Sequence, residues 1–296
     1  MTDAAVPTES PIEQPLDPPR DVVRDVVARA IAEDLGPLGD ITAALVPEDA
    51  RAVADVVVRA DGVLAGTACA SEVFGQLDAT VDVEWHARDG AHVTAGTVVA
   101  VVGGSFRSVV TAERTALNFL CHLSGVATAT SRFVAALGGR ARILDTRKTL
   151  PGLRALEKAA IRAGGGSNHR ASLSDMVLLK DNHLVGSTIT SAVARAHELW
   201  PGRTVEVECD RPEQVVEAVE AGSDIVMLDN MTPDEAAKCA AIVRESDRSD
   251  VLVEVSGGIT IENVGDYADA GVDLISTSAI TQSAPALDIA LDLRVR

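Results

Sequence analysis

The spacing of apolar residues changes twice along the chain, and each change predicts a different kind of structure. Residues 21–35 place apolar side chains at helical spacing. Between residues 52 and 104, short valine-rich runs are broken by Asp-Gly, Thr-Ala-Gly and Gly-Gly turns, which is typical of antiparallel strands. Residues 111–137 return to helical spacing, with Thr111 as the expected N-cap. We therefore expect the first half of the chain to form an antiparallel sheet with accompanying helices.

From residue 141 onward, short apolar runs alternate with helical segments, which favours a parallel sheet covered by helices. Six runs predict strands: ARILDT, MVLLKD, TVEVECD, DIVMLDN, VLVEVSGG and DLISTSA. At the ends of these strands stand Asp145, Lys180, Glu208, Asp229, Ser256 and Ser276. In a parallel α/β barrel such ends open on one mouth, where the chemistry takes place. No GxGxxG motif follows the first strand, so we favour a barrel over the alternative of an open, doubly wound sheet.

The composition limits the binding partners and the cellular compartment that we expect. The 296 residues carry a formal net charge of −18, which disfavours nonspecific binding to nucleic acid or to an anionic membrane. No apolar run approaches the ~20 residues that a membrane span requires. The four cysteines form no CxxC pair and no metal-like grouping with histidine, so we expect a reducing cytoplasm. Residues 1–20 are rich in proline and predict a disordered tail.

A run of cations between residues 145 and 183 stands out against this acidic background. Two of them directly follow a strand, two follow a glycine triplet that would let the backbone approach a ligand or turn through positive φ, and one ends the next strand. The members of this group are Arg147, Lys148, His169, Arg170 and Lys180. Several cations that converge on one mouth predict a small ligand with more than one carboxylate.

The helix between these cations carries three more, Arg154, Lys158 and Arg162, at spacing i, i+4, i+8. Two interpretations stay open for them: a solvated basic face, or a part of the cation site. The chain contains few lysines and many arginines, so each lysine is a candidate for a role that arginine cannot fill.

Two neighbouring strand ends predict a phosphate site. SGGIT at residues 256–260 is expected to end a strand and open a helix, which would leave backbone N–H groups free for an anion, and STSA at residues 276–279 repeats this pattern one strand later. Glu206 and Glu208 point to the same face of their strand, with Glu208 nearer the mouth, and Asp229 ends the next strand. Carboxylates beside a phosphate site predict contacts to ribose hydroxyls, or to Mg²⁺ on a pyrophosphate.

These motifs resemble the quinolinate phosphoribosyltransferase family. The resemblance is carried, in chain order, by EDLGPLGDIT, GVLAG, ERTALNFLCHLSGVAT, DTRKTLPGLRALEKAAIRAGGGSNHR, LSDMVLLKDNH, VEVEC, VMLDN, EVSGGI and DLISTSAIT. It implies an N-terminal α/β sandwich domain over residues 21–125, rejoined by residues 284–296, and a C-terminal α/β barrel of parallel strands over residues 126–283. It also implies transfer of phosphoribosyl from phosphoribosyl pyrophosphate to quinolinate with decarboxylation. The products would be nicotinate mononucleotide, pyrophosphate and CO₂, a step of NAD biosynthesis.

The family pattern implies a role for each candidate residue. Lys148, Glu208 and Asp229 would be catalytic, with both acids beside the ribose and the metal-bound pyrophosphate. Mg²⁺ would be bound mainly through the pyrophosphate of the substrate. The substrate-binding residues would be Arg114, Thr146, Arg147, His169, Arg170, Lys180, Ser256, Gly257, Gly258 and Ser276.

The family is dimeric or larger, and the resemblance implies a homodimer or larger homo-oligomer in which Arg114 reaches the neighbouring subunit's site. Arg114 is expected in the first turn of helix 111–137, where the helix dipole disfavours a cation, so a role elsewhere would explain its position.

Three other functions are weaker. A related barrel enzyme acting on another pyridine or nucleobase acid is disfavoured because all the dicarboxylate-binding cations are present. A lipoyl or biotinyl carrier, which RDGAHVTAGTVVAVVGG resembles, needs a lysine at its turn, and the first lysine of the chain is Lys148. A phosphate-sensing barrel without catalysis leaves Glu208 and Asp229 unexplained.

Overall fold

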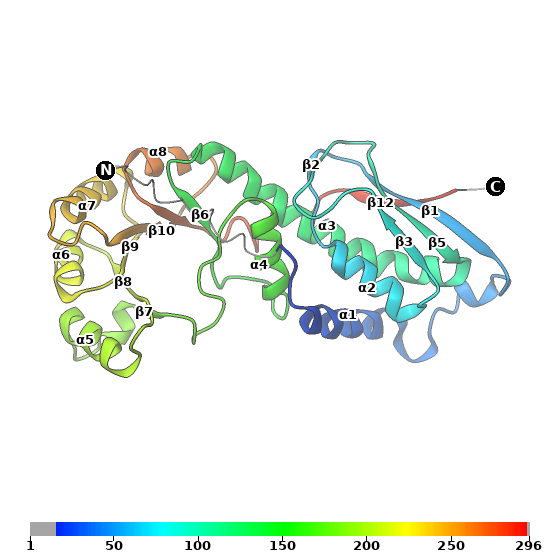
Figure 1. Cartoon of the computed structure of the whole chain (residues 1–296), viewed down its shortest axis with the longest axis horizontal. Coiled ribbons are helices and arrows are strands. Elements are labelled where there is room, and N and C mark those ends of the chain that lie inside the picture. The colour runs from blue at the N-terminus through cyan, green and yellow to red at the C-terminus, as the bar shows by residue number, and fades with distance from the viewer. Residues whose placement is uncertain (1–15, 295–296) are drawn as a thin grey trace, which may run out of the picture.

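One long helix connects the two domains of the computed structural model, which describes residues 16–294 (Figure 1). Helix α3 (Phe106–Leu137) has 32 residues and is about 48 Å long. Its start differs from the prediction, because Thr111 lies inside the helix and is not its N-cap. Val109 is fully buried ahead of Thr111, so packing extends the helix back to Phe106 without a capping side chain.

The N-terminal domain is built on an antiparallel sheet in the order β12-β1-β5-β3, as residues 52–104 predicted. Valine and alanine, together with Gly104, occupy the buried positions of β1 and β5. Helix α2 packs on α3, and α1 packs on α2, which completes the helical side of the sandwich. The elements are α1 (Arg20–Leu35), η1 (Gly36–Leu38), η2 (Ala43–Leu45), β1 (Arg51–Val58), β2 (Gly62–Val63), α2 (Thr67–Leu77), β3 (Asp82–Trp85), β4 (His92–Val93) and β5 (Val98–Ser105).

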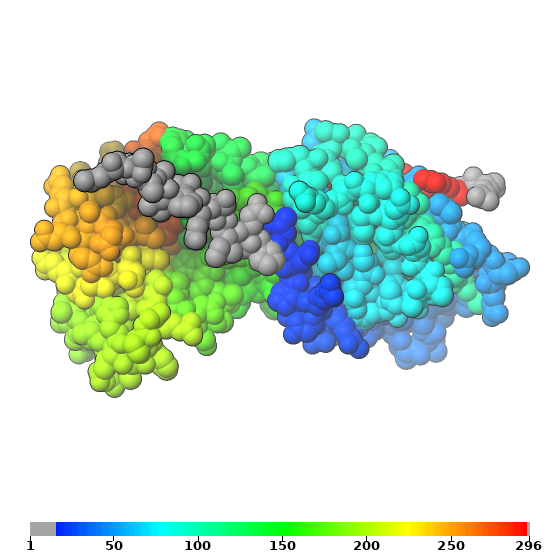
Figure 2. Space-filling model, viewed as in Figure 1, coloured from blue at the N-terminus to red at the C-terminus, as the bar shows by residue number. Residues whose placement is uncertain are grey.

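The first described residues, from residue 16 onward, lie at the junction of the domains (Figure 2). Figure 2 shows the segment from residue 16 through α1, in dark blue, between the two lobes. Residues 1–15 of the predicted tail lie outside the described residues, whereas α1 begins at Arg20. In the part of the chain that is described, no helix combines the length and apolar character needed to cross a membrane.

The last described strand, β12 (Ile289–Leu293), returns to the N-terminal sheet and pairs with β1. On its way the chain crosses α3 at Gly125, where an added Cβ would lie 2.2 Å from the carbonyl oxygen of Pro285. A hydrogen bond from the Leu287 N–H to the Cys121 carbonyl (2.9 Å) holds this crossing. Glycine at position 125 is therefore required by close contact between two backbones.

The C-terminal domain contains all six predicted strands, which are parallel and run in the order β6-β11-β10-β9-β8-β7. Helices α5 to α8 lie on the outer side of this sheet (Figure 1). Among residues 16–294 no ladder joins the edge strands β6 and β7, and Ser167 instead pairs with Leu144 of β6 in an isolated bridge. The elements are β6 (Arg142–Leu144), α4 (Arg154–Ala163), β7 (Val177–Leu179), η3 (Asp181–His183), α5 (Ile189–Leu199), β8 (Val205–Cys209), α6 (Pro212–Ala221), β9 (Ile225–Asp229), α7 (Pro233–Glu245), β10 (Leu252–Ser256), α8 (Val264–Asp269) and β11 (Leu274–Ser276).

Candidate active site

A pocket of about 660 Å³ opens at the carboxyl ends of the parallel strands. Every predicted catalytic and substrate-binding residue except Arg114 lines it. The lining residues are Thr146, Arg147, Lys148, His169, Arg170, Leu178, Lys180, Glu208, Met227, Asp229, Asn230, Ser256, Gly257, Gly258 and Ser276. Parallel strands bring their ends to one edge of a sheet, which explains why residues more than a hundred positions apart meet here.

One side of the pocket is cationic. Arg147 and Arg170 both line it, and burial together with the neighbouring charge of Arg147 lowers the pKa of Arg170. Two hydrogen bonds fix the loop that carries Arg147. The Lys148 N–H donates to the Thr146 hydroxyl (2.9 Å), and the Thr281 hydroxyl donates to the Lys148 carbonyl (2.8 Å). Guanidinium groups held together against their repulsion are suited to an anion with two carboxylates.

The three cations of α4 support this loop, which excludes the solvated-face interpretation. Lys158 is buried, and its ammonium group donates to the Asp145 carboxylate (2.5 Å) and to the His169 carbonyl (2.7 Å). Arg154 donates to the Arg147 carbonyl (3.3 Å), and Arg162 donates to the Asn168 side chain (2.7 Å). These contacts tie α4 to both cationic segments of the pocket.

Asp145 is the centre of that support and lies below the mouth. Its carboxylate is fully buried and also accepts hydrogen bonds from the Asn168 side chain (2.8 Å) and the His169 N–H (2.9 Å). Burial raises the pKa of Asp145 and lowers that of Lys158, and the ion pair between them opposes both shifts. Asp145 therefore positions the loops at residues 146–150 and 167–170 and does not line the pocket.

The glycine triplet before His169 serves packing against α3. A Cβ at Gly164 would lie 2.4 Å from the Ala127 carbonyl, and one at Gly166 would lie 2.7 Å from Thr130. Gly165 adopts φ +83°. From the sequence we expected these glycines to allow a close approach to a ligand or a turn through positive φ. The structure shows the turn at Gly165, and the close approach is to helix α3.

Two acids also line the pocket. Lys180 and Glu208 form an ion pair across the ends of β7 and β8. Asp229 accepts a hydrogen bond from the side chain of Asn230 (2.8 Å), the described non-glycine residue with positive φ (56°). Two carboxylates thus line the same pocket as Arg147 and Arg170.

The predicted phosphate segment is a loop and not the start of a helix. After β10 the chain turns through Gly257 (φ +92°) and Gly258 (φ +63°), and α8 begins only at Val264. A Cβ at Gly257 would lie 2.2 Å from the Asn230 side-chain oxygen, so glycine is required there on two grounds. Likewise no helix follows Ser276 directly. The expectation of two helix starts was wrong, although the glycine loop still lines the pocket.

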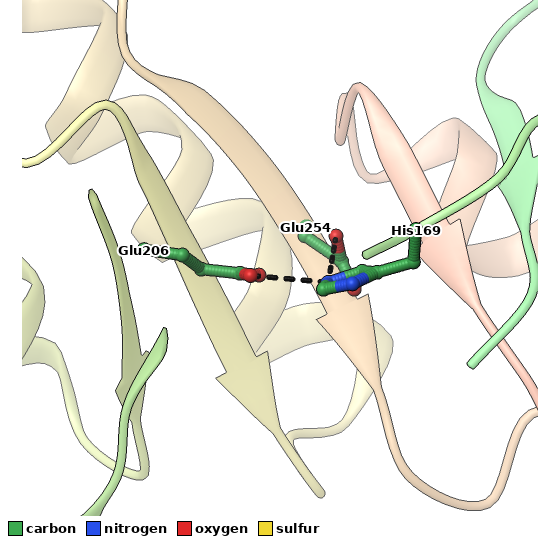
Figure 3. Close-up of side chains that lie close together, drawn as sticks. All are labelled: His169, Glu206 and Glu254. Carbon is green, nitrogen blue, oxygen red and sulfur yellow. Dashed lines mark ion pairs between the residues drawn. The ribbon is translucent and has the colours of Figure 1, made fainter. Parts of the chain in front are cut away.

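The pocket residue His169 belongs to a close group of three side chains with two buried glutamates (Figure 3). Glu206 of β8 and Glu254 of β10 both point toward the ring of His169. The His169 Nε2 atom is 3.0 Å from Glu206 Oε2 and 3.7 Å from Glu254 Oε2. The Nδ1 atom accepts a hydrogen bond from the Arg170 N–H (2.7 Å). His169 thus lines the pocket while both ring nitrogens face protein atoms.

Comparison with known proteins identifies this arrangement. The family model for the quinolinate phosphoribosyl transferase N-terminal domain matches residues 40–124, and the model for the C-terminal domain of the same family matches residues 126–292. The chain belongs to the quinolinate phosphoribosyltransferase family. The boundary between the two matches falls inside α3, which explains how one helix contributes to both domains.

Relatives from distant organisms are similar over nearly their whole length. The chain is 42% identical to a nicotinate-nucleotide pyrophosphorylase (carboxylating) of Mycobacterium leprae, covering 90% of this chain and 95% of that one. A probable enzyme of the same name from Synechocystis is 40% identical and covers 89% and 90%. The structure of the nicotinate-nucleotide pyrophosphorylase from Francisella tularensis superposes with a TM-score of 0.88 at 38% identity, covering 96% and 99%.

In this phosphoribosyltransferase, three pocket residues were not predicted from the sequence: Leu178, Met227 and Asn230. Leu178 and Met227 stand two residues before Lys180 and Asp229 on β7 and β9, so strand alternation directs both into the barrel. That spacing was a usable signal. Asn230 follows Asp229 directly in VMLDN, but its positive φ was not visible in the sequence.

Arg114 lies apart from the pocket of its own chain. It stands well inside α3, not in a first turn, so the expected conflict with the helix dipole does not exist. Its side chain is exposed and lies 3.7 Å from the Glu113 carboxylate. Its assignment therefore depends on the family resemblance and on its exposure.

Proposed function

We propose that this pocket joins quinolinate to the phosphoribosyl group of phosphoribosyl pyrophosphate, with loss of pyrophosphate and CO₂. The observation that carries the proposal is one pocket lined by both kinds of group that the two substrates require: guanidinium and ammonium groups, and two carboxylates with a glycine loop. Two anionic substrates can be held side by side only if each meets its own set of donors. The printed names of the relatives support the same reaction.

The cationic side is the proposed site of quinolinate. Arg147, Arg170 and Lys180 supply donors for its two carboxylates, and Leu178 offers an apolar surface to the ring. Lys148 stands on the same loop as Arg147 and faces both substrates in this proposal. Thr146 and His169 complete this side as residues that shape the pocket.

The acidic side and the glycine loop are the proposed site of phosphoribosyl pyrophosphate. The 5′-phosphate lies against Ser256, Gly257, Gly258 and Ser276, whose hydroxyls and N–H groups are the donors. As the pyridine nitrogen attacks the anomeric carbon and pyrophosphate leaves, positive charge develops on the ribose. Glu208 and Asp229 are suitable counter-charges for it. The pyridine nitrogen has no proton to lose, so the first step requires no general base.

Mg²⁺ is proposed to enter with the pyrophosphate. Among the described residues, the group of three close metal-type ligands is His169, Glu206 and Glu254, and neither Glu208 nor Asp229 belongs to it. An ion carried by phosphate oxygens needs no such protein cage. Accordingly no side chain is assigned as a ligand of Mg²⁺.

The direct test is to mix the protein with quinolinate, phosphoribosyl pyrophosphate and Mg²⁺ and to measure CO₂ and pyrophosphate. We expect equal amounts of both. Nicotinate, which lacks the second carboxylate, should be turned over far more slowly, and omission of phosphoribosyl pyrophosphate should abolish CO₂ release. Failure to release both products in equal amounts would sink the proposal.

We further propose a homodimer or larger assembly that works in a reducing cytoplasm. The exposed Arg114 supports shared sites, because it lies apart from its own pocket and resembles the family's partner-reaching arginine. The four cysteines are unpaired thiols, which fits a reducing compartment.

A further inference from the structure

The carboxylates of Glu206 and Glu254 are buried with few donors. Both side chains are fully buried, and the donors that face them among the described residues are His169 Nε2, 3.0 Å from Glu206 Oε2, and the Ser276 hydroxyl beside Glu254. Two ionised carboxylates with so few donors are strongly unfavourable in an environment that excludes water. The group therefore needs either a shared proton or a bound cation.

His169 can satisfy only one of these charges. Because its Nδ1 accepts the Arg170 N–H, that atom carries a lone pair and the ring proton lies on Nε2. Nε2 is nearer to Glu206 than to Glu254. Its single proton is thus directed to Glu206, and Glu254 keeps an uncompensated charge unless it is protonated.

We propose that Glu206 and Glu254 share one proton, and that this carboxyl pair fixes the ring of His169 and, through it, the backbone of Arg170 at the quinolinate side of the pocket. The inference rests on the proposed function, because Arg170 is assigned to quinolinate there. Both glutamates act as positioning residues, since His169 lines the pocket and they do not.

The surroundings of the pair favour a single negative charge. Burial and the charge of Glu206 raise the pKa of Glu254 to about 8. The charged groups that face the cluster are His169 itself, Lys158 from α4 and Arg170 from the cationic loop. The neighbouring strands contribute Leu178, Met227 and Ser276, which carry no charge.

A pH dependence of binding follows. When the shared proton leaves, a second negative charge appears behind the cations that hold a dianion. Quinolinate binding should therefore weaken as the pH rises through about 8, whereas binding of phosphoribosyl pyrophosphate at the opposite side should change less.

The kinetic test compares Glu254→Gln with Glu206→Gln over pH 6 to 9.5. In the wild type, kcat/KM for quinolinate should fall about tenfold per pH unit above the pKa, mainly through KM. Glu254→Gln supplies a permanent N–H in place of the shared proton and should lose this alkaline fall. Glu206→Gln removes the negative charge that faces His169 Nε2 and should lower kcat/KM about tenfold or more at every pH. The exposed Glu245→Gln is the matched control and should keep the wild-type profile.

Two measurements on the folded protein need no activity. The C=O stretching band of a protonated carboxylic acid should be present at pH 7 in the infrared spectrum, disappear as the pH rises through about 8, and be missing in Glu254→Gln. Elemental analysis should find no stoichiometric transition metal. An unchanged alkaline fall in Glu254→Gln, absence of the carboxylic acid band, or one bound metal ion per chain would each overturn the proposal. If the protein shows the band but does not turn over quinolinate, the proposed function fails and the proton-sharing pair stands.

Discussion

The mouth of the pocket and the layer directly below it are built from the same strands, but charged side chains line the pocket in the first and are buried in the second. Glu208 lines the pocket beside Lys180, whereas Glu206, two residues earlier on β8, is fully buried against His169. The lysines differ in the same way: Lys148 is exposed at the mouth, and Lys158 is buried against Asp145. The charged groups at the mouth line a pocket that substrates can enter, whereas those below it face one another inside the protein.

This difference separates binding from positioning. A residue at the mouth can be removed with little effect on folding, because water can replace its contacts. Removing a residue from the lower layer leaves its partner charged and buried. Substitutions in the two layers should therefore affect different measurements.

The largest effect on stability is expected for Lys158→Ala. It leaves the fully buried Asp145 without its cation, and we expect a loss of about 3–5 kcal/mol in the free energy of unfolding. Denaturant unfolding followed by circular dichroism measures this. Lys238→Ala, an exposed lysine on α7, is the control and should change little. Equal stability of the two variants would show that the buried pair does not hold the loops.

For Lys148→Ala we expect the largest effect on activity, about 100-fold or more in kcat, because a cation facing both substrates is lost. Its denaturation midpoint should stay close to that of the wild type, since the side chain is exposed. The assay is CO₂ release at saturating substrates. A large drop in the midpoint would break the distinction between the two layers.

A shared site predicts partial recovery when two inactive variants are mixed. Arg114→Ala and Lys148→Ala place their defects in different subunits of a heterodimer, so one of its two sites is intact. After subunit exchange of equal amounts, about a quarter of the wild-type activity should return. No recovery, with exchange verified by mass spectrometry, would contradict a role for Arg114 across the interface.

The smallest expected effect concerns stability and pH. The raised pKa of Glu254 means that the folded state keeps a proton that the unfolded state has lost, so stability falls as the pH rises from the unfolded value toward about 8. Between pH 7 and pH 8 the wild type should lose about 1 kcal/mol more than Glu254→Gln. Thermal unfolding at both pH values measures the difference. Parallel curves would indicate that Glu254 is ionised throughout this range.

Much of the site could be predicted because its signals are local. Each barrel strand is a short apolar run that ends in a polar residue, and parallel strands bring those ends together. Strand alternation would also have indicated Glu254, which stands two residues before Ser256 in the same way that Glu206 precedes Glu208. The helix starts were predicted less well: Val109 extends α3 ahead of Thr111, and the loop after Ser256 runs on to Val264.

The sequence by itself determined the six strands, the residues at their ends and the charge of the pocket, because alternation and polarity are properties of neighbouring positions. The tertiary structure alone decided how deeply each side chain is buried. Lys158 is buried beside Asp145, Glu206 and Glu254 both contact His169, and the glycine triplet packs against α3. Depth depends on which segments cover a side chain, and segments far apart in the sequence supply that cover. The same residue type therefore binds a substrate at one level and supports the pocket at the next.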